Sequence, residues 1–285
     1  MMTRLDVENL WVKFPTRNGI FDAVRGVSFS LGEERLGIVG ESGSGKSMTG
    51  RAILRLIRKP GQVTANHISL DGEDLLKLSE RKMRSVRGQH ISMIMQDPKF
   101  SLNPVMTVGE QMMESYTLQV KGPRFQAKDK VLEMLDAVAI RDPGRVFNAY
   151  PHELSGGMGQ RVMIAMMLIP DPDILIADEP TSALDVSVQM QVLNILDKLV
   201  RDRGMGLIFI SHDLNLVSSF CDRVLIMYAG RIVEACAADK LHEAKHPYTQ
   251  GLLKSLPRLD SPQERLEVLD RDPAWAETDS VSGVT

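Results

Sequence analysis

The segment Gly40 to Ser47, GESGSGKS, constrains the fold of this chain most strongly, because it matches the pattern G-x-x-x-x-G-K-[ST]. It follows the apolar run RLGIV and precedes MTGRAILRLIR, which has the character of a helix. Its three glycines allow the backbone to wrap around phosphate oxygens, with N–H groups pointing inward and the helix N-terminus adding positive potential. The sequence therefore predicts a phosphate-binding loop between a buried strand and a helix.

Two side chains of this loop carry the expected nucleotide chemistry. Lys46 would reach the β and γ phosphates, and the Ser47 hydroxyl would ligate Mg²⁺. The residues expected to contact ATP here are Gly40, Glu41, Ser42, Gly43, Ser44, Gly45, Lys46, Ser47 and Met48.

Short apolar and β-branched runs recur along the chain with helical stretches between them, which is the alternation expected of a parallel sheet covered by helices. These runs are RLGIVG, HISMIMQ, DILIAD, GLIFIS and RVLIMY. Leu5 to Val12 and Val27 to Leu31 add two strands ahead of the loop. VMTVGEQMMESYTL and AKDKVLEMLDAVAI show helical periodicity instead. We therefore expect an α/β fold with an antiparallel β edge subdomain and an all-helical insertion. The match of the Gly40–Ser47 loop to the P-loop motif resembles P-loop NTPases, which implies a core of the RecA-like type.

The run DILIADEP is an apolar strand that ends in two acids, Asp178 and Glu179. A carboxylate at the end of a strand beside the phosphate loop suits a water-mediated contact to Mg²⁺, and Asp178 is placed for it. Glu179 would then face the γ phosphate and polarise an attacking water. Together with the loop, this strand predicts a nucleotide-hydrolysing site.

Charge and cysteine content limit the remaining function classes. The chain has 34 Lys and Arg residues and 37 Asp and Glu residues, which gives a net charge of −3. It therefore lacks the excess of positive charge that would indicate nucleic acid as the main partner. The two cysteines, Cys221 and Cys236, have no metal-ligand spacing and favour a reduced cytosolic compartment. Apolar runs fall short of the roughly 18 to 20 residues that span a bilayer, so we expect a membrane to be reached through a partner.

The stretch LSGGMGQR, Leu154 to Arg161, is similar to the signature motif of the nucleotide-binding subunits of ATP-binding cassette (ABC) transporters, and its position upstream of DILIADEP agrees. The resemblance implies that two nucleotide-binding domains pack head to tail, so that the signature turn of each closes on the γ phosphate held by the other. Neither chain alone would then have a complete site. The signature residues expected to meet the partner's ATP are Ser155, Gly156, Gly157 and Gln160.

The same resemblance assigns further residues. Gln96 matches the Q-loop glutamine that touches Mg²⁺ and water, and Asp185 in SALD matches the D-loop at the dimer interface. His212 in FISHD matches the switch histidine that holds the γ phosphate and the attacking water. The expected catalytic residues are thus Glu179, His212 and Gln96, and the expected metal ligands are Ser47, Gln96 and Asp178.

An aromatic residue is expected to stack on the adenine. Phe14 is the first candidate because it ends the first strand ahead of the loop, and Phe21 and Trp11 are its rivals.

Two segments, QDPKFSLNPVMTVGEQ (96–111) and HPYTQGLL (246–253), resemble the dipeptide, oligopeptide and nickel importer branch. This resemblance implies an ATP-hydrolysing subunit at the cytoplasmic face of a bacterial inner membrane that powers import of di- or oligopeptides. Nickel or another small solute is the alternative cargo, and a soluble ABC ATPase acting on DNA or ribosomes, or a subunit that binds ATP without hydrolysing it, are rival functions. Implied partners are a second ATPase subunit, identical or paralogous, two permease subunits and, indirectly, a periplasmic binding protein.

The expected domain layout follows from these segments. Residues 1–256 form the nucleotide-binding domain, with its core in 1–96 and 161–240 and its helical insertion at about 97–160. Residues 241–285 form a C-terminal extension with a flexible end, and the lack of cysteine in that tail excludes an iron–sulfur cluster there. For HPYT the residues alone indicate only a helix start, with Pro247 in the first turn.

Overall fold

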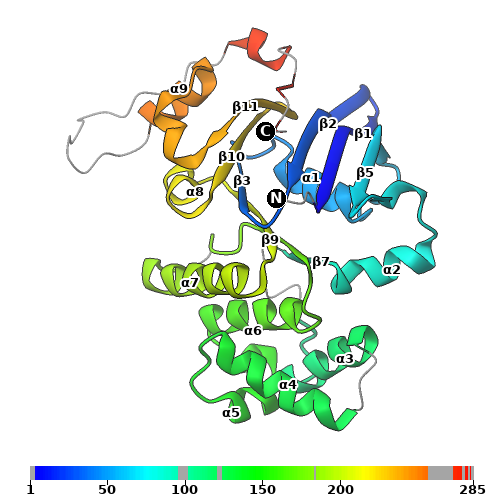
Figure 1. Ribbon diagram of the computed structural model, residues 1–285, viewed down its shortest axis with the longest axis vertical. Helices are drawn as coiled ribbons and strands as arrows, with labels where there is room; N and C mark the ends of the chain where they lie inside the picture. Colours follow the sequence, from blue (N-terminus) through cyan, green and yellow to red (C-terminus); the bar gives the residue numbers. More distant parts are fainter. Residues whose placement is uncertain are drawn as a thin grey trace. The chain divides into compact units, whose positions relative to one another are not determined.

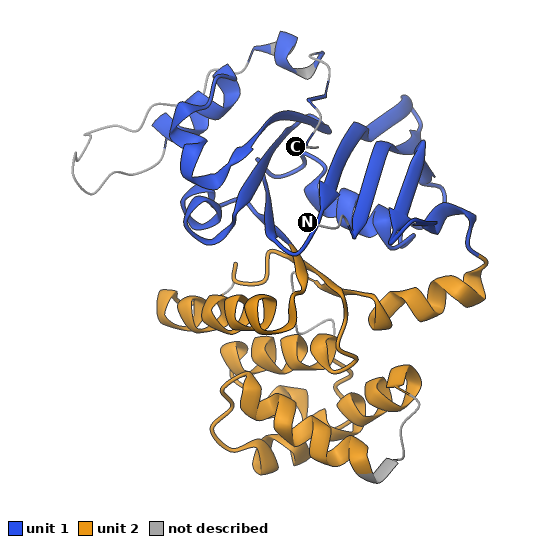
Figure 2. Cartoon of the chain, in the orientation of Figure 1, with its two compact units in different colours: residues 1–78, 208–285 blue, residues 79–207 orange. Residues whose placement is uncertain are grey.

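The computed structural model describes residues 4–95, 102–120, 124–182, 184–255, 272–277, 280–281 and 283. The chain divides into two compact units, shown in Figure 2. The first unit comprises residues 1–78 and 208–285, and the second comprises residues 79–207.

The first unit contains an antiparallel sheet in the strand order β2-β1-β5-β6, with β4 paired to β1 (Figure 1). Successive side chains of a strand point to opposite faces of a sheet, and most of the apolar residues of these strands occupy the face that is buried. The strands and the short helix that follows them are β1 (Leu5–Thr16), β2 (Gly19–Leu31), β4 (Gln62–Thr64), β5 (His67–Leu70), β6 (Glu73–Asp74) and η1 (Leu75–Lys77). This sheet is the predicted antiparallel edge.

The first unit also contains the strand path β11-β10-β3-β9, in which β10 runs parallel to β3 and antiparallel to β11. β3 is apolar and almost wholly buried, as expected for a strand covered on both faces. Helix α1 packs against β1 and β2. The elements are β3 (Arg35–Val39), α1 (Lys46–Ile53), β9 (Gly206–Ser211), α8 (Leu214–Phe220), β10 (Arg223–Tyr228), β11 (Arg231–Ala237), η4 (Ala238–Glu243), α9 (Pro247–Lys254) and η5 (Pro273–Ala276).

The second unit is mainly helical and includes the parallel strand pair β7 and β8 (Figure 1). Helices α3 and α4 occupy the two segments whose periodicity predicts helices, and they pack against each other. The elements are α2 (Glu80–Gln89), β7 (Ile91–Ile94), α3 (Val108–Val120), α4 (Arg124–Ala137), α5 (Pro143–Asn148), η3 (Pro151–Glu153), α6 (Gly156–Leu168), β8 (Ile174–Asp178) and α7 (Val186–Arg203). The fold is α/β, as predicted.

Neither cysteine takes part in a disulfide: Cys221 is buried and Cys236 is half-buried. Within the part of the chain that the structure describes, no helix combines the length and the apolar character needed to cross a membrane.

The contact between β3 and α8 depends on Gly37. A Cβ placed on Gly37 would lie 2.2 Å from Val217 Cγ1 and 3.1 Å from Cys221 Sγ. α8 therefore packs directly on the backbone of the strand that leads into the phosphate-binding loop.

We expect Gly37→Ala to lower the free energy of unfolding by about 1–3 kcal/mol, because the added methyl group forces α8 away from β3. Gly159→Ala is the matched control, since a Cβ there meets nothing within 4 Å. That control gains up to about 1 kcal/mol from helix propensity. Urea denaturation measures both, and a Gly37→Ala protein as stable as wild type would contradict this packing.

Candidate functional site

The phosphate-binding loop runs from the end of β3 to the start of α1, and two of its glycines are required by close backbone contacts. A Cβ on Gly40 would lie 2.1 Å from the carbonyl oxygen of Met227. Gly45, the N-cap of α1, has φ of 103°, and a Cβ on it would lie 2.5 Å from the carbonyl oxygen of Ala23. A side chain at either position would displace the loop.

Lys46 begins α1 and is only 5% exposed. Its Nζ donates hydrogen bonds to the carbonyl oxygens of Gly40 at 2.7 Å and Glu41 at 2.8 Å. The ammonium group therefore lies over the loop, next to the N-terminus of a helix. The loop amides, the helix N-terminus and the lysine together suit a polyphosphate. The hydrogen bonds of an ammonium group to phosphate are charge-assisted, and therefore stronger than its bonds to neutral carbonyl oxygens.

A pocket of about 440 Å³ brings the loop together with the predicted switch histidine. His212 follows β9 directly and is exposed. The other lining residues come from the end of β3, the loop, and helices α8 and α9. They are Val39, Gly40, Glu41, Ser42, Leu214, Leu252 and Ser255. Sequence reasoning missed Leu252 and Ser255, which close the pocket from the C-terminal part of the chain.

The predicted acidic pair lies at the end of β8. Asp178 is the last residue of the strand and is 1% exposed. Glu179 is half-buried and has a positive φ of 48°. The backbone NH of Ser182 donates to the Glu179 carbonyl at 3.3 Å, and the Ser182 hydroxyl donates to the same oxygen at 3.2 Å. A non-glycine residue in this region is strained, by about 1–3 kcal/mol, and such residues cluster at functional sites.

The signature turn, Ser155 to Gly157, has no bulky side chain on its solvent-exposed side. Ser155 is the N-cap of α6, and its Oγ accepts a hydrogen bond from the backbone NH of Met158 at 3.4 Å. Ser155 and Gly156 are exposed, and a Cβ on Gly156 would meet nothing within 4 Å. The turn thus presents a hydroxyl, a glycine backbone and the N-terminus of a 13-residue helix.

Gly157 and Gln160 connect the signature helix to other parts of the second unit. A Cβ on Gly157 would lie 2.8 Å from Val188 Cγ1 in α7. Gln160 is only 3% exposed, and its amide nitrogen donates to the carbonyl oxygen of Pro180. The structure therefore places the Gln160 side chain inside its own chain, where it joins α6 to the turn after Glu179.

Asp185 is the N-cap of α7. Its Oδ1 accepts hydrogen bonds from the backbone NH of Val188 at 3.0 Å and from the Ser187 hydroxyl at 2.8 Å. These bonds, above all the one from Val188, lower the pKa of the Asp185 carboxyl. The carboxylate thereby fixes the start of α7.

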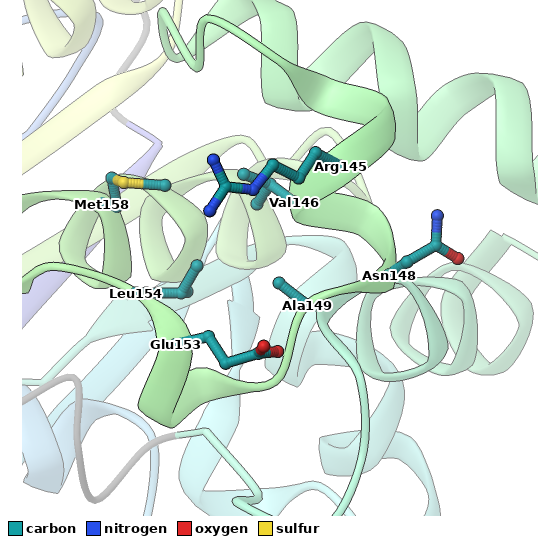
Figure 3. A pocket seen from close by; sticks show the side chains of 7 residues that line it. All are labelled: Arg145, Val146, Asn148, Ala149, Glu153, Leu154 and Met158. Atoms are coloured by element: carbon teal, nitrogen blue, oxygen red, sulfur yellow. The ribbon is translucent and has the colours of Figure 1, made fainter.

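A smaller pocket of about 230 Å³ adjoins the signature turn (Figure 3). Figure 3 shows Arg145 and Met158 on one side of it and Glu153 on the other. The Glu153 carboxylate accepts a hydrogen bond from the backbone NH of Tyr150 at 2.7 Å. The remaining lining residues are Val146, Asn148, Ala149 and Leu154. Leu154 and Met158 of this lining belong to the LSGGMGQR stretch, whereas the sequence analysis singled out none of its other residues.

The three candidate aromatics differ in their surroundings. Phe14 is half-buried in β1, and a Cβ on Gly61 would lie 2.6 Å from its ring. Its cross-strand partner Phe21 is 57% exposed. The Trp11 indole donates to Asn9 Oδ1 at 2.9 Å.

The predicted metal ligands are one hydroxyl, one amide and one carboxylate. Ser47 lies half-buried in the first turn of α1, beside Met48. Gln96 lies outside the described residues. Among the residues described, no group of three or more His, Cys, Asp or Glu side chains is arranged to hold a metal ion.

Comparisons with known proteins match nearly the whole chain. Residues 24–182 match the family model described as ABC transporter. Residues 233–282 match the model described as Oligopeptide/dipeptide transporter, C-terminal region.

Three individual proteins illustrate the similarity. The dipeptide transport ATP-binding protein DppD of Bacillus subtilis (strain 168) is 47% identical over 272 residues, covering 94% of this chain and 81% of the relative. The oligopeptide transport ATP-binding protein OppD of the same organism is 48% identical over 263 residues, covering 91% of this chain and 74% of the relative. The solved dimeric structure of a post-hydrolysis state of the ATP-binding cassette MJ0796, bound to ADP and Pi, is 26% identical, with a TM-score of 0.74, and covers 82% of this chain and 98% of that one.

We expect Asp185→Ala to lower the melting temperature at pH 7, and Asp185→Asn, which keeps a capping oxygen, to lower it less. Because hydrogen bonds depress the folded pKa of Asp185, its ionic stabilisation is present above the ordinary pKa of about 3.9. The stabilisation is lost as the pH falls through the lower folded pKa. Melting curves between pH 7 and pH 3 test this, and an Asp185→Ala protein as stable as wild type at pH 7 would contradict the capping role.

Proposed function

Because this chain belongs to the ABC transporter family, we propose that it is the ATP-binding and ATP-hydrolysing subunit of an importer of dipeptides or oligopeptides. The observation that carries the nucleotide site is the pocket shared by the phosphate-binding loop and His212. The cargo class is supported by the relatives' names and by the match of residues 233–282 to the oligopeptide/dipeptide transporter region.

The ATP phosphates bind to the Gly40–Ser47 loop and the first turn of α1. Lys46 exchanges its carbonyl partners for the β and γ phosphates, to which its ammonium group makes charge-assisted hydrogen bonds. Phe14 stacks on the adenine. Ser47, Asp178 and Gln96 would hold Mg²⁺ together with the phosphates, and the ion, when bound, would supply positive charge that neutralises the phosphates.

Hydrolysis depends on a base and on an orienting group. Glu179, fixed by the strained turn after β8, accepts a proton from the attacking water. His212 donates a hydrogen bond to the γ phosphate and holds the water in line for attack. Gln96 would complete this set as a contact to Mg²⁺ and to the water.

The site is completed by a second ATPase subunit, identical or paralogous. Ser155 and the backbone of Gly156 and Gly157 donate to the γ phosphate that the partner's loop holds, and α6 adds its positive end. The exposed, unobstructed outer side of the turn supports this role. Asp185, which orders the start of α7 next to Gly157, lies at the same interface.

A permease subunit docks on the start of α3. A pocket of about 530 Å³ there combines apolar side chains with two carboxylates, and Val105 at its edge is 79% exposed. Its lining residues are Val105, Met106, Glu110, Met113, Glu114 and Thr117. This lining fits a helix that presents an apolar face with basic flanks. The chain is then peripheral, on the cytoplasmic face of the inner membrane, with two permease subunits and, through them, a periplasmic binding protein.

We expect Glu179→Gln to reduce ATP hydrolysis by the assembled transporter at least about 100-fold while ATP still binds, because the amide cannot accept the proton of the attacking water. Lys46→Ala instead weakens binding, because it removes the cation from the loop.

Glu133→Gln is the matched control, because Glu133 lies on α4 and its exposed carboxylate only pairs with Lys130. Steady-state phosphate release and equilibrium ATP binding separate the two effects. Unchanged hydrolysis in Glu179→Gln would contradict the role of that residue, and unchanged ATP binding in Lys46→Ala would contradict the nucleotide site itself.

A further inference from the structure

The HPYT segment starts α9 and brings Tyr248 against the phosphate-binding loop. Tyr248 is completely buried. Its hydroxyl oxygen accepts a hydrogen bond from the backbone NH of Glu41, with 3.1 Å between nitrogen and oxygen. A buried phenol needs such a partner, and here the partner is a backbone amide of the loop.

The peptide unit between Gly40 and Glu41 is held from both of its sides. A trans peptide is planar and points its C=O and N–H in opposite directions. Lys46 Nζ donates to the Gly40 carbonyl at 2.7 Å, while the Glu41 N–H donates to Tyr248. Tyr248 thus sets the plane of the peptide whose carbonyl oxygen holds the loop lysine.

The position of Tyr248 is itself fixed by the residues before it. His246 is the N-cap of α9, and its Nδ1 accepts a hydrogen bond from the backbone NH of Tyr248 at 3.1 Å. Burial lowers the pKa of His246 and so favours the neutral imidazole, and the bond from the Tyr248 NH requires the tautomer whose Nδ1 carries no proton. The Glu234 carboxylate accepts from the backbone NH groups of Lys245 at 2.6 Å and His246 at 3.3 Å.

Aromatic rings support Tyr248 from the sides. The ring of Tyr228 in β10 lies 4.5 Å from that of Tyr248, centroid to centroid. Trp275, from the C-terminal segment, contacts both tyrosines edge-on, at 6.1 Å from Tyr228 and 6.2 Å from Tyr248. Trp275 therefore packs on the residue that holds the loop.

A second chain of hydrogen bonds connects the C-terminal segment to the loop. The Ser280 hydroxyl donates to the carbonyl oxygen of Arg25 at 2.9 Å. The backbone NH of Arg25 donates to the Gly230 carbonyl at 2.7 Å, and the Gly230 NH donates to the Ser44 carbonyl at 3.0 Å. Two separate sets of contacts thus connect Trp275 and Ser280 to the Gly40–Ser47 loop.

We propose that Tyr248 is a positioning residue for the phosphate-binding loop, and that the C-terminal segment supports it through Trp275. The inference rests on the proposed function, in which this loop binds ATP. Tyr248 acts through the Gly40–Glu41 peptide, and the expected benefit is a loop already shaped for the phosphates before ATP arrives. Without the hydroxyl only the Lys46 bond to the Gly40 carbonyl remains of the two contacts to this peptide, so the peptide is held less firmly before ATP binds.

Tyr248→Phe keeps the ring and its packing and removes only the hydroxyl. Loss of one net hydrogen bond corresponds to an increase of about 2- to 10-fold in the Kd of ATP for the full chain. The same increase is expected in the KM for ATP of the assembled transporter, with kcat at saturating ATP near the wild-type value. Amide hydrogen exchange at Glu41 in the nucleotide-free chain becomes faster, because the amide has lost its acceptor.

Tyr228→Phe is the matched control, because it removes a hydroxyl from the same aromatic cluster while the bond to Glu41 remains. It is expected to leave the Kd and Glu41 exchange at wild-type values. The inference is overturned if Tyr248→Phe binds ATP as wild type does, or if both variants weaken binding equally. Lys46→Ala distinguishes this failure from that of the proposed function, because a chain that still binds ATP after Lys46→Ala does not use this loop at all.

Discussion

A loop that binds phosphate through its backbone N–H groups leaves almost no room for side chains. This steric limit determines which residues of the first unit can lie against the loop. The loop approaches the Met227 and Ala23 carbonyl oxygens so closely that Gly40 and Gly45 admit no Cβ. Lys46 is the exception, and its charge lies over the loop rather than in solvent. The strand before the loop is equally restricted, because Gly37 lets α8 pack on its backbone.

The neighbours that shape the loop come from widely separated parts of the chain. Ala23 belongs to β2, Gly230 to the turn after β10, and Tyr248 to α9. Described residues of the C-terminal extension therefore contact the loop or its neighbours, as our proposal for Tyr248 requires. The HPYT segment, whose residues alone indicated only a helix start, places Tyr248 against this loop.

Much of the fold was predictable, because strong hydrophobic patterns predict strands and helices well. The five apolar runs became β3, β7, β8, β9 and β10. The strands that no pattern indicated are short or half-buried: β4, β5, β6 and β11. Residues 241–285 were expected to form a C-terminal extension with a flexible end, and within that extension Trp275 and Ser280 make specific contacts. Composition cannot show such contacts, because each is made by one residue in an otherwise polar stretch.

The site was predictable wherever a motif carries its own chemistry. The loop and His212 do meet in one pocket. Leu252, Ser255 and Tyr248 were missed, because their importance comes from where α9 packs rather than from their residue types. The internal bond of Gln160 to Pro180 was missed for the same reason. In contrast, the bare outer side of the signature turn follows directly from two glycines at the start of a helix.

In the function proposed above, one ATP is held between the loop of one subunit and the signature turn of another. ATP binding to the isolated Ser155→Arg chain, measured beside ATP hydrolysis by the transporter assembled with it, tests this most directly. We expect the isolated chain to bind ATP with wild-type affinity, and the transporter to lose hydrolysis of the nucleotide that faces the altered turn. Wild-type hydrolysis by the transporter, or loss of ATP binding by the isolated chain, would contradict the shared site.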